Sequence, residues 1–288
     1  MGIKFIIKEG ANCMANTADK IVVSPLTDFM GALVTGIDVS DPIGEEVRRM
    51  LRDAWWRYGL LLLQEQNIDE VKQAEFASIF GEVSNEGEYG AQNYVSNTIP
   101  NGIVPVGELA FHVDHSWSDD PLRGLMLYGI EVPSVGGDTR FVDVKKAFDL
   151  LSSVQRELVQ SLRIVHSYPD QTKNLPIPGP DPRPGMPSSE HQMALPHPVT
   201  GDALLFCSPR HFDHIVGWPA QEGLVLAQQM AAHMERPDIS YSHKWRAGDL
   251  IIWDNLWLQH ARTDFDPKYR RHLRRTQIGK PSIQRETA

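Results

Sequence analysis

Residues 107–117 read GELAFHVDHSW, and within this stretch His112 and Asp114 stand two positions apart. On a β-strand, side chains at positions i and i+2 point to the same face. A third ligand from a distant strand would complete a set of two imidazoles and one carboxylate. Such a facial set leaves positions on Fe(II) open for substrates and oxygen. The motif therefore favours a mononuclear iron site built on strands.

A second copy of the motif occupies residues 211–213 (HFD). Polar surface residues are the alternative interpretation of either copy. The first copy is favoured because a Gly-Gly-Asp-Thr turn at 136–139 follows it, and about 150 residues remain before His260 for the strands of a barrel. The second copy follows a Ser-Pro turn and lies outside any strand pattern. The usual zinc signatures, Cys-x-x-Cys and His-Glu-x-x-His, are absent from the sequence.

The third candidate ligand, His260, ends the aromatic stretch WDNLWLQH (253–260). Taken alone, a histidine there is more often a packed core residue. Four arginines follow within residues 270–275, and alternation on a strand would place Arg271 and Arg275 on one face. A guanidinium can hold a carboxylate through two parallel hydrogen bonds. The cluster therefore indicates an anion-binding pocket beside His260, with a solvated strand edge as the alternative.

The rest of the chain reads as many short strands with helices outside them, which favours a single domain over residues 1–288. The predicted helices cover residues 45–58, 69–80, 144–151, 154–162 and 219–236. The predicted strands include residues 60–63, 125–130, 250–253 and 273–278.

Two segments lack a clear period. Residues 81–106 are rich in Gly, Asn, Ser and Glu, and we expect a mobile active-site segment there. Residues 172–190 form a proline-rich insert, in which prolines oppose both helix and sheet. Such an insert is either a lid over the active site or a disordered surface loop.

Composition excludes several classes of protein. The 288 residues carry a net charge of −9, which argues against a nucleic-acid-binding protein. Cys13 and Cys207 form no close pair, so we expect no disulfide framework and a cytoplasmic location. No stretch approaches the roughly 18 apolar residues that a membrane span needs.

The sequence resembles the taurine dioxygenase family (TauD/TfdA) of Fe(II)- and 2-oxoglutarate-dependent dioxygenases over nearly its whole length. The matching blocks are VTGIDVSD (34–41), GLLLLQEQ (59–66), GELAFHVDHSW (107–117), MLYGIEVPSVGGDTRFVDVKKAFDLL (126–151), HPVTGDALLF (197–206), HIVGWP (214–219), WRAGDLIIWDNLWLQHAR (245–262) and YRRHLRRTQIGK (269–280). The blocks occur in the order and at the intervals of the family, so the likeness is far more specific than the His-x-Asp motif.

This resemblance implies a mainly β fold with flanking helices and a double-stranded β-helix (jelly-roll) core. It implies oxidation, most simply hydroxylation, of a C–H bond in a small anionic organic substrate, with 2-oxoglutarate and O2 consumed and succinate and CO2 released. A homodimer or homotetramer is expected on the same ground. The residues implied are His112, Asp114 and His260 for Fe(II), Thr139 and Arg271 for 2-oxoglutarate, and Arg275 and His211 for the substrate.

Two other classes of protein fit the same residues. A cupin-like hydrolase or isomerase would use the three ligands with zinc or manganese and without oxygen. A non-catalytic protein that binds small acids would keep the pocket but not turn over. Consumption of oxygen coupled to loss of 2-oxoglutarate distinguishes the dioxygenase from both.

Overall fold

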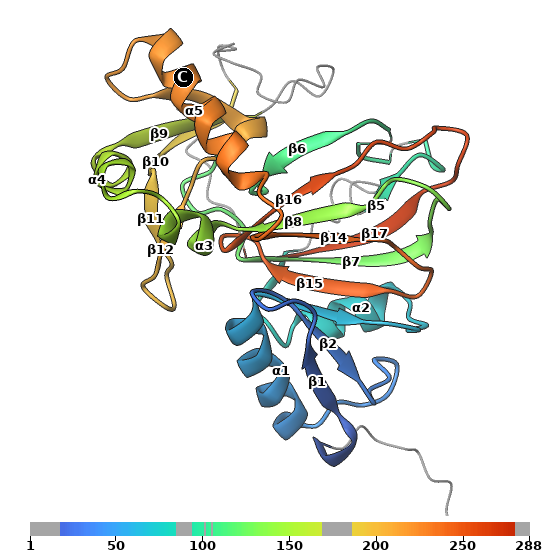
Figure 1. The fold of residues 1–288 in the computed structure, drawn as a ribbon. Coiled ribbons are helices and arrows are strands. Elements are labelled where there is room, and N and C mark those ends of the chain that lie inside the picture. Colours follow the sequence, from blue (N-terminus) through green and yellow to red (C-terminus); the bar gives the residue numbers. More distant parts are fainter. Residues whose placement is uncertain (1–17, 85–93, 101, 105, 169–185, 280–288) are drawn as a thin grey trace, which may run out of the picture.

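The computed structural model describes residues 18–84, 94–100, 102–104, 106–168 and 186–279. Its centre consists of two β-sheets that face each other, with helices on the outside (Figure 1). The larger sheet pairs its strands antiparallel except for β2 and β3, which are parallel. In spatial order, its strands are β1 (Val22–Pro25), β2 (Ala32–Thr35), β3 (Leu60–Leu63), β15 (Leu250–Asp254), β7 (Gly124–Glu131), β17 (His272–Ile278) and β4 (Val83–Ser84), with β5 (Tyr94–Ser96) also paired to β17.

The smaller sheet is antiparallel throughout and carries two of the candidate metal ligands. Its strands, in spatial order, are β14 (Ser240–His243), β8 (Thr139–Asp143), β16 (Leu258–Arg262) and β6 (Leu109–His112). The mainly β architecture with a jelly-roll core is therefore confirmed. Strands that are consecutive in one sheet come from distant parts of the chain, which brings residues 109–112 beside residues 258–262.

Apolar side chains fill the space between the two sheets. Along β15, Ile251 and Trp253 point inward, and the Trp253 ring meets Phe141 of β8 edge to face at 5.2 Å. The alternate residues Leu250 and Ile252 point outward into a second cluster. All five residues of β15 are buried because both faces of the sheet are covered, which explains why this strand reads as a continuous apolar run.

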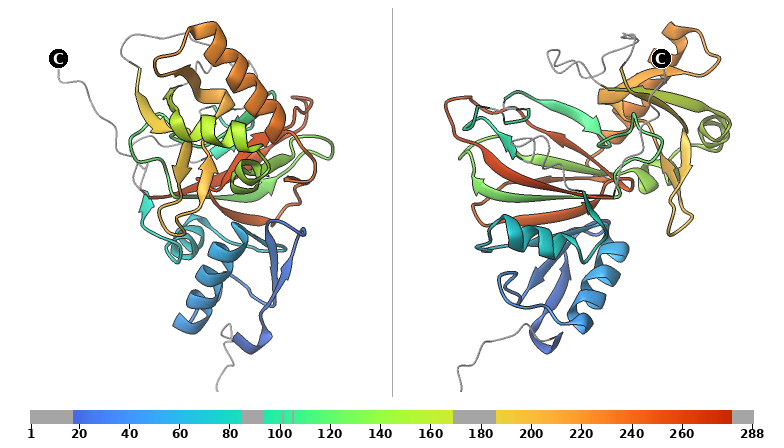
Figure 2. Two further views of the ribbon diagram at one scale, coloured as in Figure 1. Left: turned by 60° about the vertical axis from the view of Figure 1, so that its left-hand side comes forward. Right: turned by 180° about the vertical axis from the view of Figure 1, so that it is seen from behind.

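Helices cover the outer faces at opposite ends of the molecule (Figures 1 and 2). On the larger sheet lie α1 (Glu45–Tyr58) and α2 (Glu70–Ala77), which bury side chains such as Leu51 and Phe76. On the smaller sheet lie α3 (Val144–Asp149), α4 (Ser153–Ser161) and α5 (Ala220–Met234). This second end also contains β9 (Arg163–Ser167), β10 (Ser188–Gln192), β11 (Ala194–Pro196), β12 (Ala203–Leu205) and β13 (Phe212–Ile215), and two 3-10 turns complete the fold, η1 (Ala18–Lys20) and η3 (Pro209–His211).

The five predicted helices are present, each within a few residues of its expected bounds. The two segments without a period need correction. Within 81–106, β4 and β5 pair with β17, so part of this segment is regular sheet. The end of the 172–190 insert is also strand, because β10 begins at Ser188 and pairs with β9. Residues 85–93, 101, 105 and 169–185 lie outside the described residues, as does Cys13.

Cys207 is a buried free thiol. None of the helices in the described ranges is both long and apolar enough to cross a membrane.

Candidate active site

Three side chains converge at the open end of the smaller sheet. His112 is the last residue of β6, and the β-ladder places it directly opposite His260 of β16. Asp114 lies two residues beyond the end of β6, so the turn, and not the strand, aims its carboxylate. One nitrogen of each imidazole and one oxygen of Asp114 all lie within 4.8 Å of one another. Within the described residues, this is the one group of His, Cys, Asp and Glu with such convergence.

The protonation of these groups suits a metal. The Nδ1 atom of His112 lies 2.8 Å from the carbonyl oxygen of Ala110 and can donate to it, which leaves the Nε2 lone pair toward the site. Burial, and then the neighbouring His112, lower the pKa of His260 to about 3, so this imidazole is neutral. Burial acts to raise the pKa of Asp114, but the neighbouring His112, His260 and Arg275 hold it well below its ordinary value. Two imidazoles and one carboxylate are therefore available, a donor set that fits Fe(II).

A hydrogen-bond clamp fixes the main chain of Asp114. The Asn255 side chain accepts from the Asp114 backbone N–H at 3.0 Å and donates to the carbonyl oxygens of Asp114 at 3.0 Å and Leu122 at 2.9 Å. Asn255 is completely buried and follows β15 directly. The same turn thus leads into the strand of His260 and holds Asp114. Nothing in the pattern of apolar residues pointed to Asn255.

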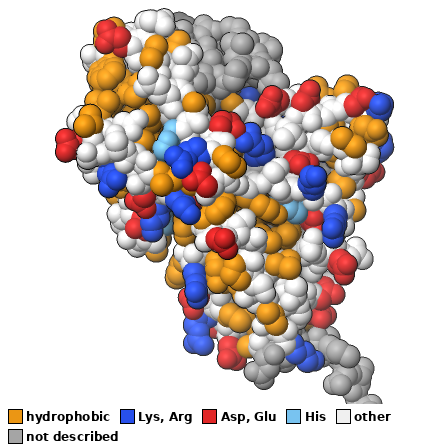
Figure 3. All heavy atoms as spheres, viewed as in Figure 1, with side chains coloured by type: hydrophobic (Ala, Val, Ile, Leu, Met, Phe, Trp, Pro, Cys, Tyr) orange, Lys and Arg blue, Asp and Glu red, His pale blue; other side chains and the backbone are white. Residues whose placement is uncertain are grey.

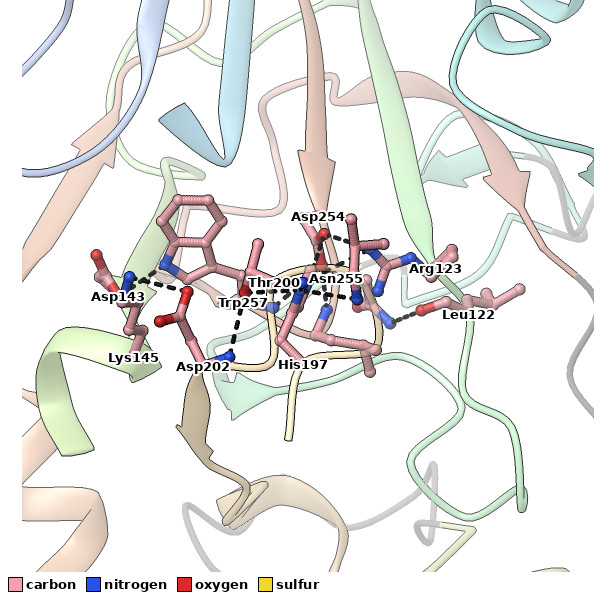
Figure 4. A network of polar contacts seen from close by, with 12 residues as sticks. Leu122, Arg123, Asp143, Lys145, His197, Thr200, Asp202, Asp254, Asn255 and Trp257 are labelled. Atoms are coloured by element: carbon pink, nitrogen blue, oxygen red, sulfur yellow. Dashed lines mark hydrogen bonds and ion pairs between the residues drawn. The ribbon is translucent and has the colours of Figure 1, made fainter. Parts of the chain in front are cut away.

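The turn is itself anchored by Asp254 (Figure 4). One carboxylate oxygen of Asp254 accepts from the backbone N–H groups of Leu256 at 3.0 Å and Trp257 at 3.1 Å. The other oxygen lies 3.0 Å from Nε2 of His197 and 3.0 Å from a guanidinium nitrogen of Arg123. The HPVTGD and WDN blocks are therefore parts of one polar network that supports the ligands from outside the cavity.

A cavity opens beside the three ligands and is lined by three arginines, Arg262, Arg271 and Arg275, together with apolar residues such as Leu125, Leu127 and Trp253. The pair Arg271 and Arg275 lies on the inward side of β17, as the alternation predicted, with Leu273 between them in the core between the sheets. The positive charges of these two arginines, beside the three candidate metal ligands, favour binding of an anion in this cavity.

Arg271 is buried deep in the cavity wall. Its Nε donates to the carbonyl oxygen of Gly137 at 3.3 Å, whereas its Nη1 is buried without a partner among the described residues. Burial and the neighbouring Arg262 lower the pKa of Arg271 well below its ordinary value. A Cβ atom at Gly137, whose φ is +69°, would lie 3.3 Å from the Arg271 side chain and 2.9 Å from Pro133. The glycine turn thus makes room for this guanidinium, which keeps one donor available for an anion.

Thr139 begins β8 opposite Arg262 and is buried. Its hydroxyl accepts from the indole N–H of Trp245 at 2.9 Å, and it is not among the residues that line the cavity. Thr139 follows Gly137 by two residues in the chain, and the carbonyl oxygen of Gly137 accepts from Arg271.

Arg275 donates to Oδ2 of Asp114 at 3.1 Å, so in this structure it pairs with a candidate metal ligand. The ring of His211 lies 5.3 Å from that of His112 and 4.7 Å from that of Trp117, edge to face in both cases. Its motif partner Asp213 points elsewhere and bonds to Ser167 and His214. The second His-x-Asp copy therefore does not join the three converging ligands.

Two arginines near the site were missed from the sequence. Arg262 lines the cavity, and its guanidinium donates to the carbonyl oxygens of Val104 at 2.6 Å and Gly107 at 2.9 Å. Arg210 of η3 is also buried. Arg262 stands two residues after His260, so strand alternation could have identified it, whereas Arg210 lies in a short turn without periodicity.

Comparisons with known proteins agree with this site. The chain matches the family described as "Taurine catabolism dioxygenase TauD, TfdA family" over residues 23–277. An alpha-ketoglutarate-dependent 2,4-dichlorophenoxyacetate dioxygenase of Cupriavidus pinatubonensis is 28% identical, covering 88% of this chain and 96% of that protein. An (S)-phenoxypropionate/alpha-ketoglutarate-dioxygenase of Sphingobium herbicidovorans is 29% identical, covering 89% and 94%. A taurine dioxygenase structure from Burkholderia xenovorans has the same fold, with a TM-score of 0.74 at 24% identity and coverage of 93% and 92%.

The fold and the comparisons together define the class of protein: an enzyme that oxidises its substrate with 2-oxoglutarate and O2 at Fe(II). The chain belongs to the TauD/TfdA family of dioxygenases. This membership supports the oxygenase over the hydrolase, isomerase and binding-protein alternatives.

Proposed function

We propose that His112, Asp114 and His260 hold Fe(II), that Arg271 and Thr139 secure 2-oxoglutarate, and that the enzyme hydroxylates a C–H bond of a small organic acid. The observation that carries this proposal is the convergence of two imidazoles and one carboxylate within 4.8 Å, beside a cavity lined by arginines. Bound Fe(II) would supply the oxygen chemistry, and the chain supplies the ligands and the surroundings.

The residues of the chain hold the ligands in place for the metal. The backbone clamp of Asn255 orients Asp114, and the Ala110 carbonyl selects the tautomer of His112. Both contacts reduce the reorganisation needed on binding the metal, as neighbouring hydrogen bonds generally do in metal sites. Arg275 neutralises the carboxylate of Asp114 and is proposed to face the acidic substrate or co-substrate once the metal takes that carboxylate.

Arg271 is proposed to bind the distal carboxylate of 2-oxoglutarate. Its buried, unpartnered Nη1 is costly to maintain unless an acceptor arrives, because an unsatisfied buried donor costs about 1–3 kcal/mol, and more when charged. The Thr139 hydroxyl accepts from Trp245 and keeps its own O–H donor, which is proposed to support the same carboxylate. The arginine is therefore the principal anchor, and Thr139 supports it.

An acidic substrate is proposed for two reasons. The relatives named above are dioxygenases of phenoxyacetate and phenoxypropionate acids. In addition, this chain of net charge −9 gathers buried arginines around the cavity. His211 is proposed to contact the substrate, since its ring lies between the rings of His112 and Trp117.

The proposal is tested with purified protein under anaerobic conditions. Fe(II) and 2-oxoglutarate together should produce a weak visible absorption band, and admission of oxygen should give slow formation of succinate. His112→Ala should abolish both signals because it removes one of three ligands. Retention of the band and of succinate formation by His112→Ala would show that the metal is held elsewhere.

A single domain over residues 1–288, a cytoplasmic location and a homodimer or homotetramer complete the proposal. Size-exclusion chromatography with light scattering tests the assembly, and a mass equal to the 32.4 kDa of one chain would reject it.

A further inference from the structure

Arg210 is a buried arginine for which the protein provides no hydrogen-bond acceptor among the described residues. It lies in the middle of η3, which packs against β6, the strand of His112. Only 6% of its surface is exposed. Across the described ranges, Arg210 donates no hydrogen bond and forms no ion pair, although its guanidinium offers five N–H donors. Burial of a cation without hydrogen bonds costs free energy, and such a residue is therefore a candidate for a functional role.

Neutralising Asp114 is not a sufficient reason for Arg210. Asp114 already accepts from Arg275 at 3.1 Å and has Nε2 of His112 at 3.3 Å. Burial lowers the pKa of Arg210, and the charges of Asp114 and Tyr168 act in the opposite direction. The geometry places this turn beside the metal ligands, because η3 packs against β6 and the ring of His211, the residue after Arg210, lies 5.3 Å from that of His112.

The other arginines at the site have tasks. Arg275 pairs with Asp114, and Arg262 donates to the carbonyl oxygens of Val104 and Gly107. Arg271 stands beside the Gly137 turn, where we place 2-oxoglutarate. Among these arginines, Arg210 is the one without a hydrogen bond or ion pair to the described residues. On the face seen in Figure 3, acidic and basic side chains intermingle.

An aromatic wall adjoins Arg210. The ring of Trp117 meets that of His211 at 4.7 Å and that of Tyr168 at 5.0 Å, both edge to face. His211, the chain neighbour of Arg210, is held by Ser116 Oγ at 2.9 Å from its Nδ1 atom. Because His211 also contacts His112, this wall runs from η3 to the metal ligands. The wall thus offers an apolar surface beside the three candidate metal ligands.

We propose that Arg210 binds the acidic group of the primary substrate and selects organic acids whose apolar body lies against Trp117 and Tyr168. This inference rests on the proposed function, and assigns the principal contact with the charged end of the substrate to Arg210 of η3, with Arg275 facing the cavity from β17. A planar guanidinium matches a carboxylate with two parallel hydrogen bonds, so carboxylates should bind more tightly than sulfonates of the same body.

The test measures binding and turnover of three probes: phenoxyacetate, its neutral analogue phenoxyacetamide, and phenoxymethanesulfonate. Dissociation constants are obtained by calorimetry on the anaerobic enzyme loaded with Fe(II) and 2-oxoglutarate, and KM from oxygen consumption. The variants are Arg210→Gln, Arg210→Lys and Arg275→Gln. Arg236→Gln is the control, because Arg236 is exposed and pairs only with Asp238 among the described residues.

The wild type should bind phenoxyacetate more tightly than the other two probes. Arg210→Gln should raise the Kd and KM of phenoxyacetate roughly 10- to 150-fold, the range for loss of a charged hydrogen bond, and should abolish the preference over phenoxyacetamide. Arg210→Lys keeps the charge but not the fork, so its effect should be smaller. Arg236→Gln should bind all three probes like the wild type.

Several results would overturn the inference. The first is that the wild type binds phenoxyacetate and phenoxyacetamide equally, and the second is that it binds neither acid. The third is that Arg275→Gln loses the preference for phenoxyacetate over phenoxyacetamide while Arg210→Gln keeps it. Should Arg210→Gln not fold, an unchanged Kd in Arg210→Lys decides against the inference. Formation of succinate without substrate is followed in parallel, because its absence in the wild type would reject the proposed function itself.

Discussion

The two sides of the active site are built differently. His112, His260, Arg271 and Arg275 come from β6, β16 and β17 or the residue beside them, where ladder hydrogen bonds fix the backbone. On the opposite side, Arg210 comes from η3, a three-residue 3-10 turn that leads directly into β13. The side for metal and 2-oxoglutarate is thus set by sheet geometry, and the side proposed for the substrate is set by turns.

This difference matches the chemistry that each side performs. The relatives named above share alpha-ketoglutarate as co-substrate, so rigid strands can serve unchanged. Substrates differ among relatives, as the phenoxyacetate and phenoxypropionate enzymes illustrate, and turns change more readily than strands without loss of the fold. Changes on the strand side should therefore affect all substrates, and changes on the turn side should affect selection.

The largest effect is expected at Asp114. Asp114→Asn keeps the shape of the side chain but removes the negative charge that the site offers to Fe(II) beside its two imidazoles. Since loss of a mere supporting contact costs a metal site about 10- to 100-fold in affinity, loss of this ligand should exceed about 100-fold in Fe(II) affinity and in succinate formation. Metal content after dialysis and the rate of oxygen uptake measure it.

Asp213→Asn is the matched control, because Asp213 belongs to the second His-x-Asp copy and bonds to Ser167 and His214 away from the ligands. It should keep full metal content. Loss of iron in Asp213→Asn but not in Asp114→Asn would reverse the assignment of the two copies and with it the comparison of the two sides.

The second effect, smaller in size, concerns Arg271. Arg271→Gln should raise the Kd of 2-oxoglutarate roughly 10- to 150-fold for every substrate, since it removes a charge-assisted hydrogen bond. Its neighbour Arg270 is exposed and pairs with Glu131, so Arg270→Gln should leave the Kd unchanged. Titration of the visible band measures both. Equal effects of the two variants would mean that the cluster acts only through its overall charge.

The sequence allowed the strand side to be predicted well, for a physical reason. Alternation along a strand relates residues two positions apart, so Arg271 and Arg275 could be assigned to one face from their spacing alone. The long apolar runs at 60–63 and 250–253 indicated strands buried on both sides. Asp114 shows the limit of this reasoning, because it lies beyond the end of β6 and its direction depends on Asn255, 141 positions away.

The turn side could not be predicted in the same way. Arg210 sits in a three-residue turn, where no period tells which way a side chain points, and its neighbour His211 was named only through the family resemblance. The strands β4 and β5 have two and three residues, too few for alternation to be recognised. Their places come from pairing with β17, which is a tertiary contact and leaves no local signal.

The smallest effect concerns the support of η3. The Nε2 atom of His166 accepts from the backbone N–H of Ser208, the residue that precedes η3, at 3.0 Å. Burial, and then His191, lower the pKa of His166 well below its ordinary value, so the folded protein keeps this imidazole neutral. Below about pH 6.5 the unfolded chain binds a proton at this position and the folded chain does not. The contribution of the neutral His166 to the free energy of unfolding is therefore fully present above that pH, and it is lost as the pH falls toward the pKa of His166 in the folded protein.

His166→Gln should reduce this acid sensitivity, because its amide oxygen can still accept from Ser208 but binds no proton. The free energy of unfolding, measured by urea titration between pH 7.5 and 5, should change with pH less steeply than in the wild type, by up to about 1.4 kcal/mol per pH unit. An unchanged slope would mean that His166 is not kept neutral by its burial. His166 supports η3 and not β6 or β16. As the pH falls, phenoxyacetate binding should therefore weaken at a higher pH in the wild type than in His166→Gln. That result would show that acid affects the turn side of the site before the strand side.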